Sequence, residues 1–184
     1  MIIKDSSTGY GLVSIVLHWS TAILIAALIG LGWTFEDLPR GPERAFLIGL
    51  HVSFGLLFLV LAMARLGWRA ASGMPEPATQ GSPLLERAAR IVHRLLLLAM
   101  IVLPLSGLLL VASGGRTVQF FGLPVPLPFV PQSEWLHEAG EAVHKVTANL
   151  VLLPLLAIHV LGALKHHLVD RDGTLRRMLR PAAA

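Results

Sequence analysis

Histidine is the residue type in this chain whose placement points to chemistry, because the sequence holds eight histidines and no cysteine. Three of them, His18, His51 and His159, lie inside long apolar segments that contain no other ionisable side chain. An imidazole is costly there unless its ring nitrogens find partners, so each is a candidate metal ligand or proton carrier. The absence of cysteine excludes disulfides, iron–sulfur clusters, thiolate zinc sites and covalently attached c-type haem. Any haem must therefore be held by histidine without a covalent link.

The elements that position these histidines follow from the composition. Of 184 residues, 54% are hydrophobic and 14% are charged, and the mean hydropathy is +0.70. Such a chain is too apolar for a water-soluble domain, and four segments approach the roughly 20 apolar residues that span a bilayer. We predict an all-α, integral membrane four-helix bundle that forms one domain over residues 1–184. Its helices are expected at about residues 12–35, 44–68, 86–112 and 136–168.

Positive charge predicts the orientation of the bundle. Eleven of the fifteen Lys and Arg residues lie in the N-terminal tail, in the segment 65–94 that joins the apolar runs of the second and third helices, or after residue 164. The other four are Arg40, Arg44, Arg116 and Lys145. The positive-inside rule then places both termini in the cytoplasm. The same rule explains the pI near 10.3, so we expect no nucleic-acid partner.

The depth of each histidine suggests two pairs. His18 and His159 lie near the cytoplasmic ends of the first and fourth helices, and His51 and His144 lie near the outer ends of the second and fourth. The fifteen residues between His144 and His159 correspond to about 22 Å of rise and about 60° of rotation, so both side chains can face the bundle interior. His18 is therefore expected opposite His159, and His51 opposite His144.

Two such pairs have the donor set for two haems. Neutral imidazoles from facing helices can be axial ligands on both sides of a haem iron. Small residues one turn from the proposed ligands leave room for a macrocycle: Ser14, Ala22, Gly55, Gly140, Ala148 and Ala163. A hydrogen-bonded structural role is the alternative for any single histidine, and His137 is the fallback for His144, because seven residues place it on the same helix face.

The remaining histidines lie on the cytoplasmic rim. His93 falls between two arginines before the apolar run of the third helix, where it competes with His18 for the inner haem. Its position suits a proton-transfer, propionate or quinone contact, and a solvated interfacial histidine is the alternative. His166 and His167 lie on the same rim, and adjacent helical positions make them a poor zinc chelate.

The segment 114–131 is unlike the other connections. Its prolines bar a regular helix, while its Phe, Leu and Val side chains favour burial. We expect it to fold over the outer mouth of the bundle, either covering a cofactor or resting on the helix ends.

Short motifs in order along nearly the whole chain resemble the bacterial cytochrome b561 family. These are four-helix dihaem membrane cytochromes related to the cytochrome b subunits of hydrogenases and formate dehydrogenases. The matching stretches are Leu17-His18-Trp19, Leu50-His51-Val52-Ser53, His93 with Leu103-Pro104 and Gly107, the run from His144 through His159 to His166-His167, and residues 172–178.

The resemblance implies that His18, His51, His144 and His159 are the axial ligands of two haem b groups. It implies electron transfer from a periplasmic donor to the ubiquinone pool, in the bacterial inner membrane. Some members are similar to a superoxide oxidase, which would make the chain a superoxide:quinone oxidoreductase. Two alternatives stay open: an electron-relay subunit for a partner dehydrogenase or other periplasmic redox protein, and a non-redox bundle that binds a metal such as zinc.

Substrate chemistry suggests further site residues. Superoxide is an anion, so Arg116 and Lys145 are candidates for attracting it near the outer haem. Quinone reduction needs protons, which His93, His166 or His167 could deliver from the cytoplasmic rim.

One spacing departs from the family. The resemblance implies fourteen residues between the fourth-helix ligands, whereas this chain has fifteen. Pro154 lies between them and cannot donate to the carbonyl of Leu150, so a local bulge could absorb the extra residue; the sequence does not decide whether it does.

Overall fold

The fold is a bundle of four long helices. The computed structural model describes residues 2–73, 75 and 82–181, and within these residues four helices are long and apolar enough to cross a membrane. They are α1 (Leu12–Asp37), α2 (Pro42–Ser72), α3 (Pro83–Ser113) and a fourth span made of α4 (Glu134–Val146), the π-helical η1 (Thr147–Leu152) and α5 (Leu153–Leu168). The all-α membrane bundle expected from the composition is confirmed.

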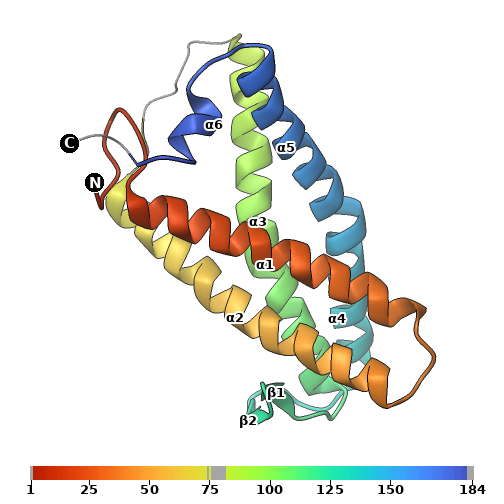
Figure 1. Ribbon diagram of the computed structural model, residues 1–184. Coiled ribbons are helices and arrows are strands. Elements are labelled where there is room, and N and C mark those ends of the chain that lie inside the picture. The colour runs from red at the N-terminus through yellow and green to blue at the C-terminus, as the bar shows by residue number, and fades with distance from the viewer. Residues whose placement is uncertain (1, 74, 76–81, 182–184) are drawn as a thin grey trace.

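The helices form two antiparallel pairs (Figure 1). α1 and α2 lie side by side, and α3 packs against both α2 and the fourth span. Both termini and the short helix α6 (Thr174–Arg177) lie at one end, called here the terminal end. The α1–α2 loop and a small strand hairpin lie at the other, called the hairpin end.

Most of the buried apolar side chains of the described residues form one cluster: Leu24, Ile25, Phe58, Ala62, Ala99, Met100, Leu103 and Leu152. It draws on α1, α2, α3 and η1, so it joins all four spans. Many other large apolar side chains face outward, as hydrocarbon-exposed helices require.

Glycine lets α3 and α4 approach closely. A Cβ on Gly140 would lie 2.9 Å from the backbone nitrogen of Leu110, and one on Gly107 would lie 3.2 Å from the His144 ring. Gly140 therefore allows the close contact between the two helix backbones, and Gly107 leaves room for the His144 ring.

The fourth span contains a bulge of the kind that the ligand spacing allows. At the end of η1 the backbone nitrogen of Leu153 donates to the carbonyl of Ala148, five residues back. Pro154 follows directly and has no N–H to give. A π-helical segment takes up one residue more than an α-helix does, so the fifteen-residue spacing is accommodated between His144 and His159.

The connection between α3 and α4 forms a strand hairpin. β1 (Val118–Phe120) pairs antiparallel with β2 (Leu123–Val125), and the two loop residues Phe121 and Gly122 both have positive φ. Ser53 of α2 holds it, because its Oγ accepts a hydrogen bond of 2.9 Å from the Phe121 nitrogen and donates one of 3.3 Å to the Gln119 carbonyl. The hairpin thus lies against α2, but the burial expected for the large apolar side chains of segment 114–131 is not found at Phe121, Leu123 and Phe129, which are 50%, 67% and 77% exposed.

Candidate haem-binding site

The structure brings the four predicted ligands together as two pairs. The ring centres of His51 and His144 are 6.1 Å apart, and those of His18 and His159 are 6.2 Å apart. A metal–imidazole bond is about 2 Å long and the nitrogen lies about 1 Å from its ring centre, so imidazoles on opposite sides of one metal place their centres about 6 Å apart. Both pairs, called here the outer and the inner pair, have the separation of two axial ligands.

The outer pair lies in a cavity of about 380 Å³ near the hairpin end, within the range of sites for cofactors. Its wall is mostly apolar and comes from all four spans, including Leu28, Val52, Leu108 and Leu152. Its glycines Gly32, Gly55 and Gly107 add no side-chain bulk. An apolar cavity with two facing imidazoles suits a flat hydrophobic macrocycle that carries an iron ion.

A backbone carbonyl fixes which ring nitrogen of neutral His144 carries the proton. Its Nδ1 lies 2.9 Å from the carbonyl oxygen of Leu103 and 3.2 Å from Oγ of Ser106. Because a carbonyl can only accept, Nδ1 donates, and in a neutral ring the Nε2 lone pair stays free for a metal ion. His144 is therefore set in the tautomer that an axial ligand needs.

One ring nitrogen of His51, the buried Nδ1, has no hydrogen-bond partner among the described residues, although the backbone of Leu28 offers the ring a hydrogen bond. The Phe35 ring packs edge-on against it, with ring centres 5.3 Å apart. Buried polar atoms without partners are rare and costly, so this ring fits a role in which a further group binds it.

The inner pair has a charged neighbour. Nη2 of Arg65 lies 2.7 Å from Nδ1 of His18, and since a guanidinium only donates, this nitrogen accepts. The ring proton of a neutral His18 then lies on Nε2, the opposite tautomer to that of His144. Arg65 also donates to Oγ1 of Thr21 at 3.0 Å, so its head group points into the bundle.

His93 lies closer to the inner pair than its place among arginines suggests. Its ring centre is 5.2 Å from that of His159, although its side chain is exposed. The structure therefore gathers three histidines at the terminal end, and His93 is in direct contact with a proposed ligand.

Arg116 and Lys145, the two residues predicted to attract superoxide, both line the outer cavity. Within the part of the chain that the structure describes, only one of them is paired with carboxylates. Lys145 lies 2.7 Å from Glu141 and 4.0 Å from Glu36, so its charge is largely balanced. Arg116 is exposed and takes part in no ion pair of the described residues. Of the two, Arg116 offers the freer positive charge.

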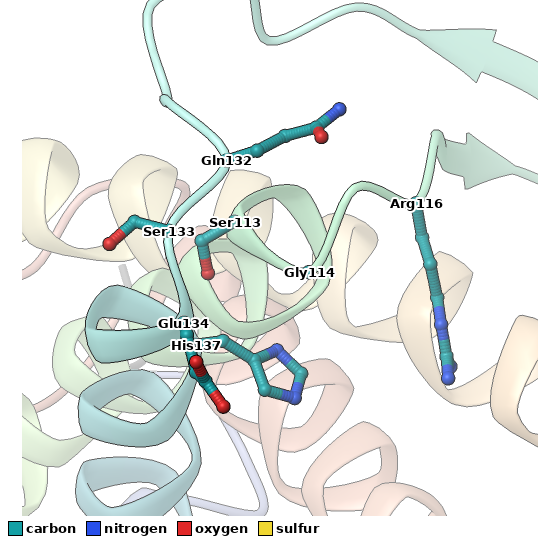
Figure 2. A pocket seen from close by; sticks show the side chains of 7 residues that line it. All are labelled: Ser113, Gly114, Arg116, Gln132, Ser133, Glu134 and His137. Atoms are coloured by element: carbon teal, nitrogen blue, oxygen red, sulfur yellow. The ribbon is translucent and has the colours of Figure 1, made fainter.

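Arg116 also borders a second, open hollow of about 440 Å³ (Figure 2). This hollow is lined by the end of α3, by Gln132 and by the first turn of α4, including His137. His137 bonds to the Leu110 carbonyl through Nδ1 at 2.8 Å and reaches no other histidine ring. The hollow and the cavity share Arg116 and His137, so these two residues stand between the outer surface and the outer pair.

The rim histidines at the terminal end have separate surroundings. Nδ1 of His166 lies 2.7 Å from Asp172 and 3.2 Å from Asp170, while His167 is exposed. Burial acts to raise the pKa of Asp172, but hydrogen bonds from Thr174 and His166 outweigh it and lower that pKa to about 2. His166 therefore faces a carboxylate and ties the chain after α5 to the helix.

Three groups at the site were given no role there from the sequence: the guanidinium of Arg65, the hydroxyl of Ser106 and the carbonyl of Leu103. Arg65 was counted only as cytoplasmic charge, although α2 continues to Ser72 and places it seven residues inside the helix. Its position directly after an apolar run was the available signal. The contacts of Ser106 and Leu103 depend on which helices meet, so no local pattern could reveal them.

Comparison with known proteins identifies the family to which this chain belongs. Residues 9–181 match the family described as Prokaryotic cytochrome b561. Cytochrome b561 homolog 2 of Escherichia coli is 32% identical over 187 residues, which cover 97% of this chain and 95% of the relative. The probable superoxide oxidase CybB of Yersinia pestis is 29% identical, covering 92% and 95%. Cytochrome b562 of Cereibacter sphaeroides is 32% identical, covering 94% and 96%.

Proposed function

Because this chain belongs to the prokaryotic cytochrome b561 family of membrane electron-transfer proteins with b-type haem, we propose that it carries electrons across the bacterial inner membrane. Two haem b groups would be held, one by His51 and His144 and one by His18 and His159. The observation that carries this proposal is the pair of ring separations near 6 Å at opposite ends of the bundle. When bound, the haems supply one-electron chemistry at both ends.

The orientation follows from charge. The terminal end carries eleven of the fifteen Lys and Arg residues, so we assign it to the cytoplasm and the hairpin end to the periplasm. Electrons then enter beside Arg116 and leave near His93, His166 and His167.

The donor that best suits the outer opening is superoxide. Arg116 is an exposed cation between the surface hollow and the cavity, which favours approach of a small anion. The relative in Yersinia pestis bears the name of a probable superoxide oxidase, which supports the same reaction here. Two superoxide anions would be oxidised to two O₂, and one ubiquinone would take up the two electrons with two protons.

The protons for ubiquinone are assigned to the cytoplasmic rim. His93 contacts the inner pair and is exposed, so it is the candidate nearest to the electron exit. Nδ1 of His166 lies 2.7 Å from Asp172, and His167 is open to solvent.

The first experiment counts the haems. Reduced-minus-oxidised spectra and pyridine-haemochrome quantitation of the purified protein are expected to give two haem b per chain. One haem per chain would contradict the assignment of two sites, and no haem with bound zinc would favour the non-redox alternative.

A kinetic assay separates a self-contained oxidoreductase from a relay subunit. If the purified protein alone reduces ubiquinone with superoxide, it is self-contained, whereas a relay subunit would need its partner.

The second experiment tests the attraction of the anion. Arg116→Glu is expected to slow superoxide-driven haem reduction by about tenfold and to reverse its dependence on salt, because screening now weakens a repulsion. Arg40→Glu makes the same charge change at an exposed position outside the cavity and is expected to change the rate less than twofold. Equal rates and equal salt dependence for wild type and Arg116→Glu would reject the role of Arg116.

A further inference from the structure

Arg65 is a cation inside the bundle without a carboxylate partner. None of the ion pairs formed by the described residues includes it. Its three acceptors are neutral: Nδ1 of His18 at 2.7 Å, Oγ1 of Thr21 at 3.0 Å and Sδ of Met100 at 3.7 Å. A charge at this depth of a membrane protein is expensive unless an anion or several strong acceptors meet it. The guanidinium therefore fits a site that receives an anion.

The strongest of these acceptors is lost when His18 binds iron. An imidazole that coordinates through Nε2 carries its proton on Nδ1, which then donates instead of accepting. A guanidinium has only donors, so Arg65 and Nδ1 of His18 can no longer bond to each other. Loading of the inner site thus leaves Arg65 with Thr21 and the weak sulfur acceptor of Met100, and a new acceptor must replace His18.

The haem brings such acceptors with it. Haem b carries two propionate carboxylates, and arginine binds carboxylates through two parallel, charge-assisted hydrogen bonds. We propose that Arg65 is the partner of a propionate of the inner haem, so that it anchors the cofactor and favours its reduced form. This inference rests on the proposed function, because it requires a haem between His18 and His159.

The outer pair offers no such cation inside the bundle. His144 bonds to a backbone carbonyl and a hydroxyl, and His51 has no partner on Nδ1. The arginines and lysine of the outer cavity, Arg44, Arg116 and Lys145, lie at its mouth, on the helix ends and the hairpin connection. Removal of Arg65 should therefore affect one haem and spare the other.

The experiment is a redox titration of the haem-loaded protein. Arg65→Gln is expected to shift the reduction equilibrium of the inner haem about tenfold toward the oxidised form, which is about 59 mV for a one-electron couple. Arg65→Lys keeps the charge and should restore most of the wild-type value. Arg87→Gln removes a charge from an exposed position near the same end and should leave both haems unchanged. A His51→Ala background, which is expected to lack the outer haem, identifies the inner signal.

A cofactor with uncharged propionates distinguishes an interaction of Arg65 with a propionate from other effects of the Arg65 charge. The protein is made by cell-free synthesis into lipid nanodiscs with haem or with haem dimethyl ester, whose propionates are uncharged. With the ester, Arg65→Gln and wild type are expected to differ less than twofold. A tenfold difference that persists with the ester would overturn the proposal, because Arg65 would then act through His18 or through its field alone.

Other outcomes are equally decisive. An unchanged inner haem in Arg65→Gln would overturn the proposal. Failure of the proposed function looks different: haem content would then be independent of His18 and His159, whatever residue occupies position 65.

Discussion

The outer and inner histidine pairs have the same ring separation and different surroundings. At the outer pair, a backbone carbonyl and a hydroxyl hold the proton of His144 on Nδ1, so this ring is prepared for a metal before any cofactor arrives. At the inner pair, Arg65 holds His18 in the opposite tautomer, and this ring must change before it binds. The fold therefore prearranges His144 as a ligand, whereas under the proposed function His18 would have to move its ring proton from Nε2 to Nδ1 when a haem binds.

The largest effect is expected for His144→Ala, and this effect should be confined to the outer site. His144→Ala should remove one of the two haems, because a single axial ligand remains, and should leave the inner spectrum in place. His137→Ala, on the same face of α4, is the matched control and should keep both haems, since it touches Leu110 and no ring of a pair. Pyridine-haemochrome quantitation measures both variants. Loss of a haem in His137→Ala and not in His144→Ala would move the outer ligand to the fallback position.

A smaller effect is expected from crowding of the same ring. Gly107→Val should cut occupancy of the outer haem severalfold, because even a Cβ at this position would lie 3.2 Å from the His144 ring. Gly30→Val is the control, since a Cβ there meets nothing within 4 Å. Haem content and the redox titration of the inner haem report both changes. Full outer occupancy in Gly107→Val would show that the ring can move aside.

The hydroxyl of Ser106 beside His144 should contribute less to haem affinity at the outer site than the space at Gly107 does. Ser106→Ala removes one of the two acceptors of Nδ1 and leaves the Leu103 carbonyl, so haem affinity at the outer site is expected to fall a fewfold, below the 10- to 100-fold typical for loss of an entire outer-shell partner. Ser113→Ala deletes a similar hydroxyl on α3 that bonds only to Leu109. Competition for haem by apomyoglobin measures the two affinities, and equal losses in both variants would deny Ser106 a specific role.

The smallest effect is expected for Asp172→Asn, which should alter the local stability of the chain at the terminal end. Asp172 has a pKa of about 2 against an ordinary 3.8, so its contribution to stability is complete above pH 3.8 and is lost as the pH falls through 2. Asp170 also contacts His166 and is itself neutralised by Lys165 at 2.6 Å. Asp172→Asn should loosen residues 169–181 already at pH 5, whereas the wild type keeps them protected from pH 5 to 4. Hydrogen exchange with mass spectrometry checks this, and equal protection in both proteins at pH 5 would contradict it.

The sequence predicted the elements and the histidine pairs because those depend on local properties. Hydropathy defines four spans, and His51 and His144 fall at one depth simply by counting residues from the helix ends. The spacing near Pro154 allowed a bulge without establishing it, and the π-helical segment supplies one. The tautomers of His18 and His144 could not be predicted, because they depend on Arg65 and Leu103, which lie 47 and 41 residues away and reach the rings only through helix packing.

The π-helical segment of the fourth span also governs how this chain can be compared with its relatives. A π-bulge is the way a helix absorbs a single added residue without changing the faces it presents before and after that point. An alignment with a chain that has one residue fewer between the two ligands must therefore place its gap within residues 147–152. A gap before residue 144 or after residue 159 would pair one proposed ligand with a neighbour about 100° away around the helix.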